Sequence, residues 1–161
     1  MAIVACSGAV IAAIDLRTRR IPNVATIVVA GLGLALSATG ASRHGALAAL
    51  AGLALGFLLM LPGHLFGATG AGDVKLFAAM GTLLGPGTVV TAFLYTAIAG
   101  GLLAFVIAAR RRRLVETVNG VAALVRTPGA NANEIESPAR HNRFAYAPAI
   151  AVGTLLAALG V

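Results

Sequence analysis

Two aspartates stand apart from the other acidic residues of the chain. Of five Asp and Glu residues in 161, three are glutamates of a polar segment near the C-terminus, whereas Asp15 and Asp73 border apolar runs. An acid at the edge of a long apolar run is costly and is a candidate functional group. Two adjacent carboxyl groups share one proton, so one can act as a base toward water while the other donates to a carbonyl oxygen. Such a pair can hydrolyse a peptide bond, and its titration belongs to both groups together.

Each aspartate also has a structural interpretation. Asp15 can pair with Arg17, Arg19 or Arg20, and Asp73 can cap the N-terminus of a helix, where the helix dipole favours negative charge. The same pair suits the ion-coupling groups of a small proton-coupled transporter. Transporters often show internal repeats and acids near the midplane, whereas this chain shows no repeat and both acids lie at one edge. A non-catalytic membrane scaffold is the third alternative.

The remaining polar residues indicate no other catalytic chemistry. The single cysteine, Cys6, excludes an internal disulfide and a Cys-rich zinc site, and the three histidines lack metal-site spacing. We therefore expect no metal and no cofactor. Ser7 has no G-x-S-x-G setting, and His64 is interpreted as an interfacial histidine.

The elements that must position the two acids are long apolar runs. The chain is 59% hydrophobic and 11% charged, with a mean hydropathy of +0.94, which excludes an ordinary soluble domain and intrinsic disorder. A helix needs about 20 residues to cross a bilayer. The sequence predicts an all-helical integral membrane protein, a single domain over residues 1–161. Its six spans are Met1–Ile14, Val24–Ala41, Ala46–Phe66, about 73–84, about 88–109 and Phe144–Val161.

Two local patterns bear on how these spans are arranged. The fourth and fifth spans come from one uncharged run that is divided at Gly85-Pro86-Gly87, a strong turn signal. In the third span, Gly52 and Gly56 lie four residues apart and predict close helix packing inside the bundle.

Basic residues lie almost entirely on one side of these spans. Eleven of the 12 Lys and Arg fall in the odd-numbered loops, and only Arg43 falls on the other side. The positive-inside rule then predicts that the acids face the cytoplasm and that both termini lie outside. The cytoplasmic loop of about 110–143 begins with four arginines and a segment, 110–126, that we expect to lie on anionic lipid headgroups. Membrane lipids are thus expected partners, and nucleic acid is not.

Each aspartate lies in a distinctive local sequence. Asp73 follows glycines in Gly70-Ala-Gly-Asp-Val-Lys-Leu, which leaves the backbone open to a substrate strand. Asp15 begins Asp-Leu-Arg-Thr-Arg-Arg-Ile-Pro-Asn23. Together with Tyr146-Ala-Pro-Ala-Ile-Ala-Val-Gly153, these blocks strongly resemble the type IV prepilin peptidases, which are GxGD intramembrane aspartyl proteases. The resemblance extends over essentially the whole chain.

The resemblance implies a fold, a site and a substrate. The fold is a six-helix transmembrane bundle of the GxGD aspartyl protease type, in which Asp15 and Asp73 match the catalytic aspartates and Gly70 and Gly72 match the motif glycines. The substrate is a type IV pilin-like precursor with a short basic leader before an apolar helix. Cleavage falls at the cytoplasmic boundary of the leader, and the helix enters the bundle from the side.

Three further residues are candidates for shaping this site. Tyr146 and Pro148 match the C-terminal block of the family, and their alternative is packing at the start of the sixth span. Lys75 is a candidate for tuning the charge of the acids or positioning the substrate, and equally a candidate topology anchor.

One departure from the larger family members narrows the resemblance. Those members carry an extra cytoplasmic segment with paired cysteines, linked to N-methylation of the cleaved pilin, whereas here the second span follows the first within ten residues. We therefore expect no methyltransferase activity. The chain is similar to the short form that serves tight-adherence (Tad/Flp) pili at the bacterial inner membrane, with pilus assembly machinery as a candidate partner. Archaeal preflagellin peptidases share the catalytic pattern and are an alternative.

Overall fold

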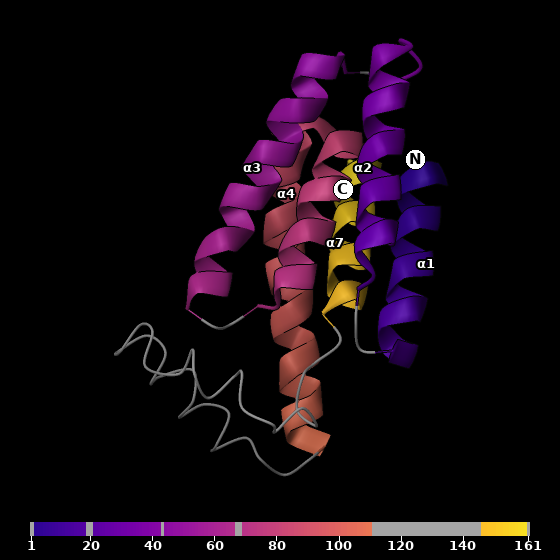
Figure 1. Ribbon diagram of the computed structural model, residues 1–161. Coiled ribbons are helices and arrows are strands. Elements are labelled where there is room, and N and C mark those ends of the chain that lie inside the picture. The colour runs from indigo at the N-terminus through magenta and orange to yellow at the C-terminus, as the bar shows by residue number, and fades with distance from the viewer. Residues whose placement is uncertain (1, 19–20, 43, 67–68, 111–145, 161) are drawn as a thin grey trace.

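The computed structural model describes residues 2–18, 21–42, 44–66, 69–110 and 146–160, whose regular elements are all α-helices. They are α1 (Ala2–Thr18), α2 (Asn23–Ala38), α3 (Ala46–Leu65), α4 (Ala71–Arg110) and α7 (Ala147–Leu159). Figure 1 shows these helices side by side in one elongated bundle. The all-helical class expected from the sequence is confirmed.

The ends of the helices follow proline and glycine. Pro22 precedes α2 with φ −65° and ψ 135°, and a proline fits at a helix start because the first N–H groups have no intrahelical acceptor. Gly45 precedes α3, and Gly160 ends α7 in the left-handed conformation at φ 75°. These helices coincide with the expected second, third and sixth spans to within about three residues. In contrast, α1 continues beyond Ile14, so Asp15 lies inside its last turn and not behind its end.

Helix α4 consists of two antiparallel arms. Phe77 and Phe93 are 16 residues apart, roughly 24 Å along a straight helix, yet their ring centroids lie 6.2 Å apart. The chain reverses at Gly85, whose φ of 75° and ψ of 169° are not helical. The turn expected at 85–87 is therefore a break at one residue. Because no loop separates the arms, the described residues form five helical elements, and the expected six separate spans are not found.

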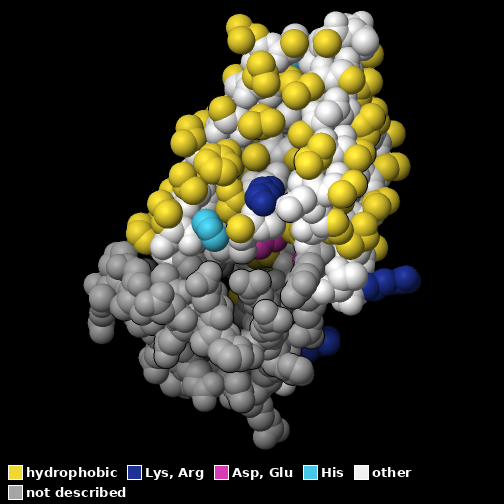
Figure 2. All heavy atoms as spheres, in the orientation of Figure 1, with side chains coloured by type: hydrophobic (Ala, Val, Ile, Leu, Met, Phe, Trp, Pro, Cys, Tyr) yellow, Lys and Arg dark blue, Asp and Glu magenta, His cyan; other side chains and the backbone are white. Residues whose placement is uncertain are grey.

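The outer surface of the bundle is apolar. By length and composition, two stretches of the described residues could cross a membrane, Ala46–Leu65 and Ala71–Ile107, and the second contains the break at Gly85. Helices α2 and α7 are apolar but shorter. Figure 2 shows hydrophobic side chains over most of the described part of one face, and Leu47 is 82% exposed. This surface supports association with a membrane.

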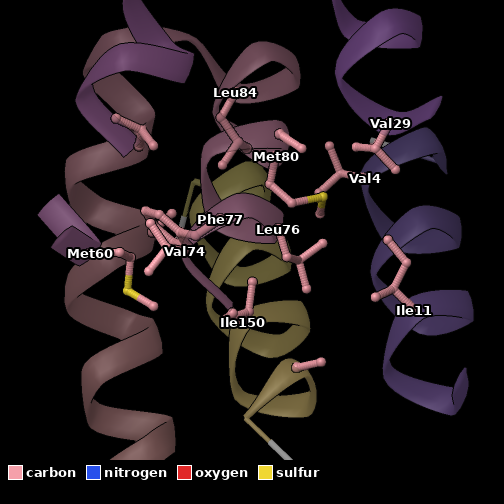
Figure 3. Packing of buried hydrophobic residues seen from close by; sticks show 14 of the residues in the cluster. Val4, Ile11, Val29, Met60, Val74, Leu76, Phe77, Met80, Leu84 and Ile150 are labelled. Atoms are coloured by element: carbon pink, nitrogen blue, oxygen red, sulfur yellow. The ribbon is translucent and has the colours of Figure 1, made fainter. Parts of the chain in front are cut away.

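The first arm of α4 lies at the centre of the bundle. Residues 74–84 are almost all buried, and Phe77 is completely so (Figure 3). Helix α3 packs closely against this arm: a Cβ added at Gly52 would collide with the carbonyl oxygen of Gly81, and one added at Gly56 would lie 3.1 Å from that of Phe77. The close packing expected from the glycine spacing is confirmed. The tightly held arm carries Asp73 at its N-terminal end.

Candidate active site

Asp73 is the third residue of α4, and the spacing of its motif explains its contacts. Gly70 lies immediately before the helix, and its backbone N–H donates to Asp73 Oδ2 at 3.1 Å. The backbone N–H of Asp73 donates in turn to the carbonyl oxygen of Gly70 at 3.0 Å. This is the returning half of a capping box, in which the third helical residue satisfies the N–H before the helix. Asp73 thus stabilises the start of α4 and remains half-buried.

Asp15 is buried in the last turn of α1, with 5% of its surface exposed. Its Oδ2 accepts a hydrogen bond of 3.3 Å from the backbone N–H of Ala147, the first residue of α7 and 132 positions away. That N–H has no acceptor within its own helix, and the positive end of the helix dipole favours a carboxylate there. Among the described residues, the hydrogen bond of Asp15 therefore goes to the start of α7 and not to the neighbouring Arg17. Arg19 and Arg20 lie outside those residues.

The start of α7 is the common neighbour of both acids. Tyr146 directly precedes Ala147, and the pKa of its phenol is raised, first by burial and second by the negative charge of Asp73. Its hydroxyl donates a long hydrogen bond of 3.5 Å to the carbonyl oxygen of Thr96 in the second arm of α4. Pro148 occupies the first turn of α7, where it needs no hydrogen-bond acceptor. Tyr146 thus joins the start of α7, where Asp15 has its contact, to the second arm of α4.

The candidate site lies at one end of the bundle. The end of α1 and the starts of α2, α4 and α7 meet there, at the lower end of the helices in Figure 1. In Figure 2, acidic side chains appear at the lower border of the apolar surface. Asp15 and Asp73 are the acidic residues of the described part of the chain, so these side chains belong to the candidate pair.

Gly72 and Lys75 contact the start of α2 rather than α7. A Cβ added at Gly72 would lie 3.3 Å from Cβ of Ile21, so the two segments touch here. Lys75 Nζ donates to Asn23 Oδ1 at 3.2 Å. Two residues correspond to a rotation of about 200° on a helix, so Lys75 and Asp73 face opposite sides of α4. Asn23 was not among the expected site residues, although an amide at the edge of an apolar run was the available signal.

The other polar groups near this end have structural contacts. Exposed His64 is hydrogen-bonded through Nδ1 to the carbonyl oxygen of Thr69 at 3.0 Å, which links the end of α3 to the segment before α4. The described residues hold no cluster of three or more His, Cys, Asp or Glu side chains. Beyond Arg110, the segment expected over 110–126 and the rest of the polar loop lie outside the described residues.

Fold and site together define an all-helical protein with an apolar exterior and two carboxyl groups at one end of its bundle. A model of the type IV leader peptidase family matches residues 2–105, which is more than half of the chain. The chain therefore belongs to the type IV leader peptidase family. No curated protein and no solved structure matches it significantly. The matched range includes Asp15, Gly70, Gly72, Asp73 and Lys75, whereas α7 lies beyond it.

Proposed function

We propose that this protein is a membrane aspartyl endopeptidase that removes the short basic leader from Flp-type prepilins at the cytoplasmic face of the bacterial inner membrane. Membership of the leader peptidase family supports the reaction class. The observation that supports the mechanism is that Asp15 bonds Ala147 at the start of α7, while Asp73 bonds Gly70 at the start of α4 at the same end of the bundle. The two carboxyl groups thus lie at one end of the bundle, although they are far apart in the sequence.

The proposed mechanism uses one proton shared between the two acids. The ionised carboxylate takes a proton from water as the water oxygen bonds to the scissile carbonyl carbon, and the protonated carboxyl group donates its proton to the carbonyl oxygen. The resulting gem-diol collapses with cleavage of the C–N bond, and the amine leaves with a proton from the first acid. The second acid recovers its proton from the gem-diol hydroxyl, so the pair ends with one proton as it began.

The surroundings of the pair suit a peptide that arrives from the membrane. The segment 70–72 carries only one side-chain carbon, so its backbone can approach a peptide closely on any side that Ile21 and Asp73 do not occupy. In the proposed six-pass topology, the two arms of α4 count as separate passes and the acids face the cytoplasm. The basic residues support this orientation. The short connection between Thr18 and Asn23 supports a peptidase without a methyltransferase segment.

Co-expression with a Flp-type prepilin tests the proposal. The wild-type protein is expected to release the leader, as read from the intact mass of the pilin, and Asp15→Asn and Asp73→Asn are each expected to lower the cleavage rate at least about a hundredfold. Glu116→Gln is the matched control, because it makes the same chemical change at an acid without a proposed role. Cleavage by either aspartate variant above about a tenth of the wild-type rate would refute the shared-proton mechanism. Loss of proton flux in both variants, with no prepilin cleaved, would instead favour the transporter.

A further inference from the structure

A groove of about 410 Å³ lies on the side of the bundle, between α2, α3 and the first arm of α4. Its lining is mainly apolar, with Phe57 of α3 on one side and the small residues Ala30, Ala78 and Ala79 among the others. One turn of an α-helix, about 10 Å wide and 5.4 Å long, occupies roughly 400 Å³. Small lining residues let a helix approach closely where lipid offers no hydrophobic drive. The groove therefore has the size and chemistry to hold a turn of an apolar helix.

One end of the groove carries a cation. Lys75 lines it together with Asn23, and the hydrogen bond to Asn23 uses one of the three donors of the ammonium group. Among the described residues, Lys75 forms no ion pair with a carboxylate, and its hydrogen bond goes to the neutral amide of Asn23. A cation beside apolar walls is complementary to an apolar segment that carries one negative charge.

The charged end of the groove lies one helical turn or less from Asp73 along α4. Lys75 and Asp73 belong to the same turn of α4, about 3 Å apart along the helix axis but on opposite sides. A chain that leaves the groove at Lys75 therefore needs only to pass around the start of α4 to reach Asp73. The residues on that path are Gly70, Ala71 and Gly72, whose own side chains are absent or small, and the side chain of Ile21 lies beside Gly72.

We propose that this groove binds the apolar helix of the substrate next to the cleavage site, and that Lys75 binds a carboxylate on that helix. This inference rests on the proposed function, because it names the subsite from which the peptide reaches the two acids. Lys75 then selects substrates by charge: it lowers KM for a helix that carries an acid near the cut.

A double-mutant cycle tests the charge contact with the full-length protein in phosphatidylcholine vesicles. The probes are peptides with a basic leader, a glycine and an alanine–leucine helix, with one glutamate or one glutamine placed in turn at each position of the first two helical turns. At one position, KM is expected to be about tenfold lower for the glutamate probe, as for a contact of about 1.4 kcal/mol. Lys75→Gln should abolish this difference and Lys75→Arg should keep most of it. Arg17→Gln removes a cation from an exposed position of α1 and should leave the difference in KM between the two probes unchanged.

A second pair of variants tests the groove itself. Ala30→Phe fills the groove and is expected to raise KM about tenfold for both probes with kcat unchanged. Ala35→Phe makes the same change at an exposed position of α2 outside the groove lining and should alter neither constant. An equal effect of both variants overturns the groove. The proposal is also overturned if KM changes when phosphatidylglycerol is added to the vesicles and is the same for the glutamate and glutamine probes. The groove would then bind lipid.

Binding without cleavage separates this inference from the proposed function. Fluorescent versions of the probes are titrated onto the Asp15→Asn variant, whose altered residue lies away from the groove lining. Binding that depends on both Lys75 and the glutamate, with no cleavage by the wild type, refutes the peptidase and supports the groove. Cleavage in which Lys75→Gln lowers kcat equally for both probes refutes the charge contact and leaves the peptidase standing. Absence of both binding and cleavage overturns both proposals.

Discussion

The substitution Asp73→Asn separates the two roles that the structure allows for this residue. The carboxylate accepts a hydrogen bond from Gly70 at the start of α4, and in the proposed mechanism it also takes part in proton transfer. Asparagine keeps an oxygen that can accept the same bond, so the structural loss is the attraction between the charge and the helix dipole, about 0.5 kcal/mol. Asp73→Ala also loses the acceptor and should lower the free energy of unfolding by about 1–2 kcal/mol.

The catalytic loss should be much larger than the structural one. Removal of a group that transfers protons lowers rates about 10²- to 10⁴-fold, which corresponds to roughly 3–5 kcal/mol of transition-state stabilisation. Single-turnover cleavage and denaturant unfolding in detergent micelles measure the two losses on the same preparations. Asp73→Asn should therefore unfold almost like the wild type and cleave almost nothing.

A stability-matched control lies at the other end of the bundle. Ser42 donates to the carbonyl oxygen of His44 at 2.6 Å and lies 3.0 Å from Ser37 Oγ. Ser42→Ala should lower the free energy of unfolding by about 1 kcal/mol and leave cleavage unchanged. Retention of more than about a tenth of the wild-type rate by Asp73→Asn would show that proton transfer does not need this residue. Its role would then be limited to the start of α4.

Two further pairs of substitutions test the packing around the site. Gly52→Ala should prevent folding or lower the free energy of unfolding by more than about 2 kcal/mol, because the new Cβ collides with the Gly81 carbonyl oxygen, whereas Gly101→Ala, with nothing within 4 Å, should be neutral or slightly stabilising. Equal unfolding curves for the two variants would contradict the close contact of α3 with α4. Tyr146→Phe removes only the long bond to Thr96 and should retain cleavage within about threefold, while Tyr146→Ala should cost about 3 kcal/mol of stability and most of the cleavage. A cleavage assay in which Tyr146→Phe is inactive would show that the hydroxyl has a chemical role that the packing does not explain.

The sequence predicted those features of the fold that depend on neighbouring residues. Pro22 marks the start of α2 because its ring limits the local backbone conformation to one that suits the first turn of a helix. The turn at Gly85 was predicted for the same reason, since a positive φ is easily reached only by glycine. The sequence did not show that the reversal takes a single residue, and so the helical elements were miscounted.

The central position of the first arm of α4 was not predicted, although its sequence held a signal. A helix that is apolar on all sides is buried, and residues 74–84 contain one charged side chain, Lys75. Segmentation by length treated this stretch as a short membrane span. Its burial depends on which helices surround it, and this is decided by contacts between residues far apart in the chain, such as Gly52 with Gly81.

The site was predictable in its residue types but not in its contacts. Asp15 and Asp73 were selected because acids are rare at the edges of apolar runs. The sequence offered Arg17, Arg19 and Arg20 as partners for Asp15, and among the described residues its hydrogen bond comes instead from the N–H of Ala147, because a buried carboxylate needs a buried donor. The start of a helix provides such a donor without a side chain, and hence without a sequence signal.

The contacts of the two acids show why the spacing of the motif matters. The spacing of Gly70 and Asp73 lets the carboxylate at the third position of α4 accept a hydrogen bond from the N–H just before the helix. Asp15 accepts a bond from the first N–H of α7, so each acid contacts the N-terminus of a helix. The positive ends of the α4 and α7 dipoles therefore both lie against the candidate pair. In the proposed mechanism, these dipoles stabilise the one negative charge that the pair carries, while repulsion between two carboxylates prevents a second. A residue inserted between Gly70 and Asp73 would move the carboxylate about 100° around α4, away from both the Gly70 N–H and Tyr146. Such an insertion should abolish cleavage even though both aspartates and both glycines remain in the chain.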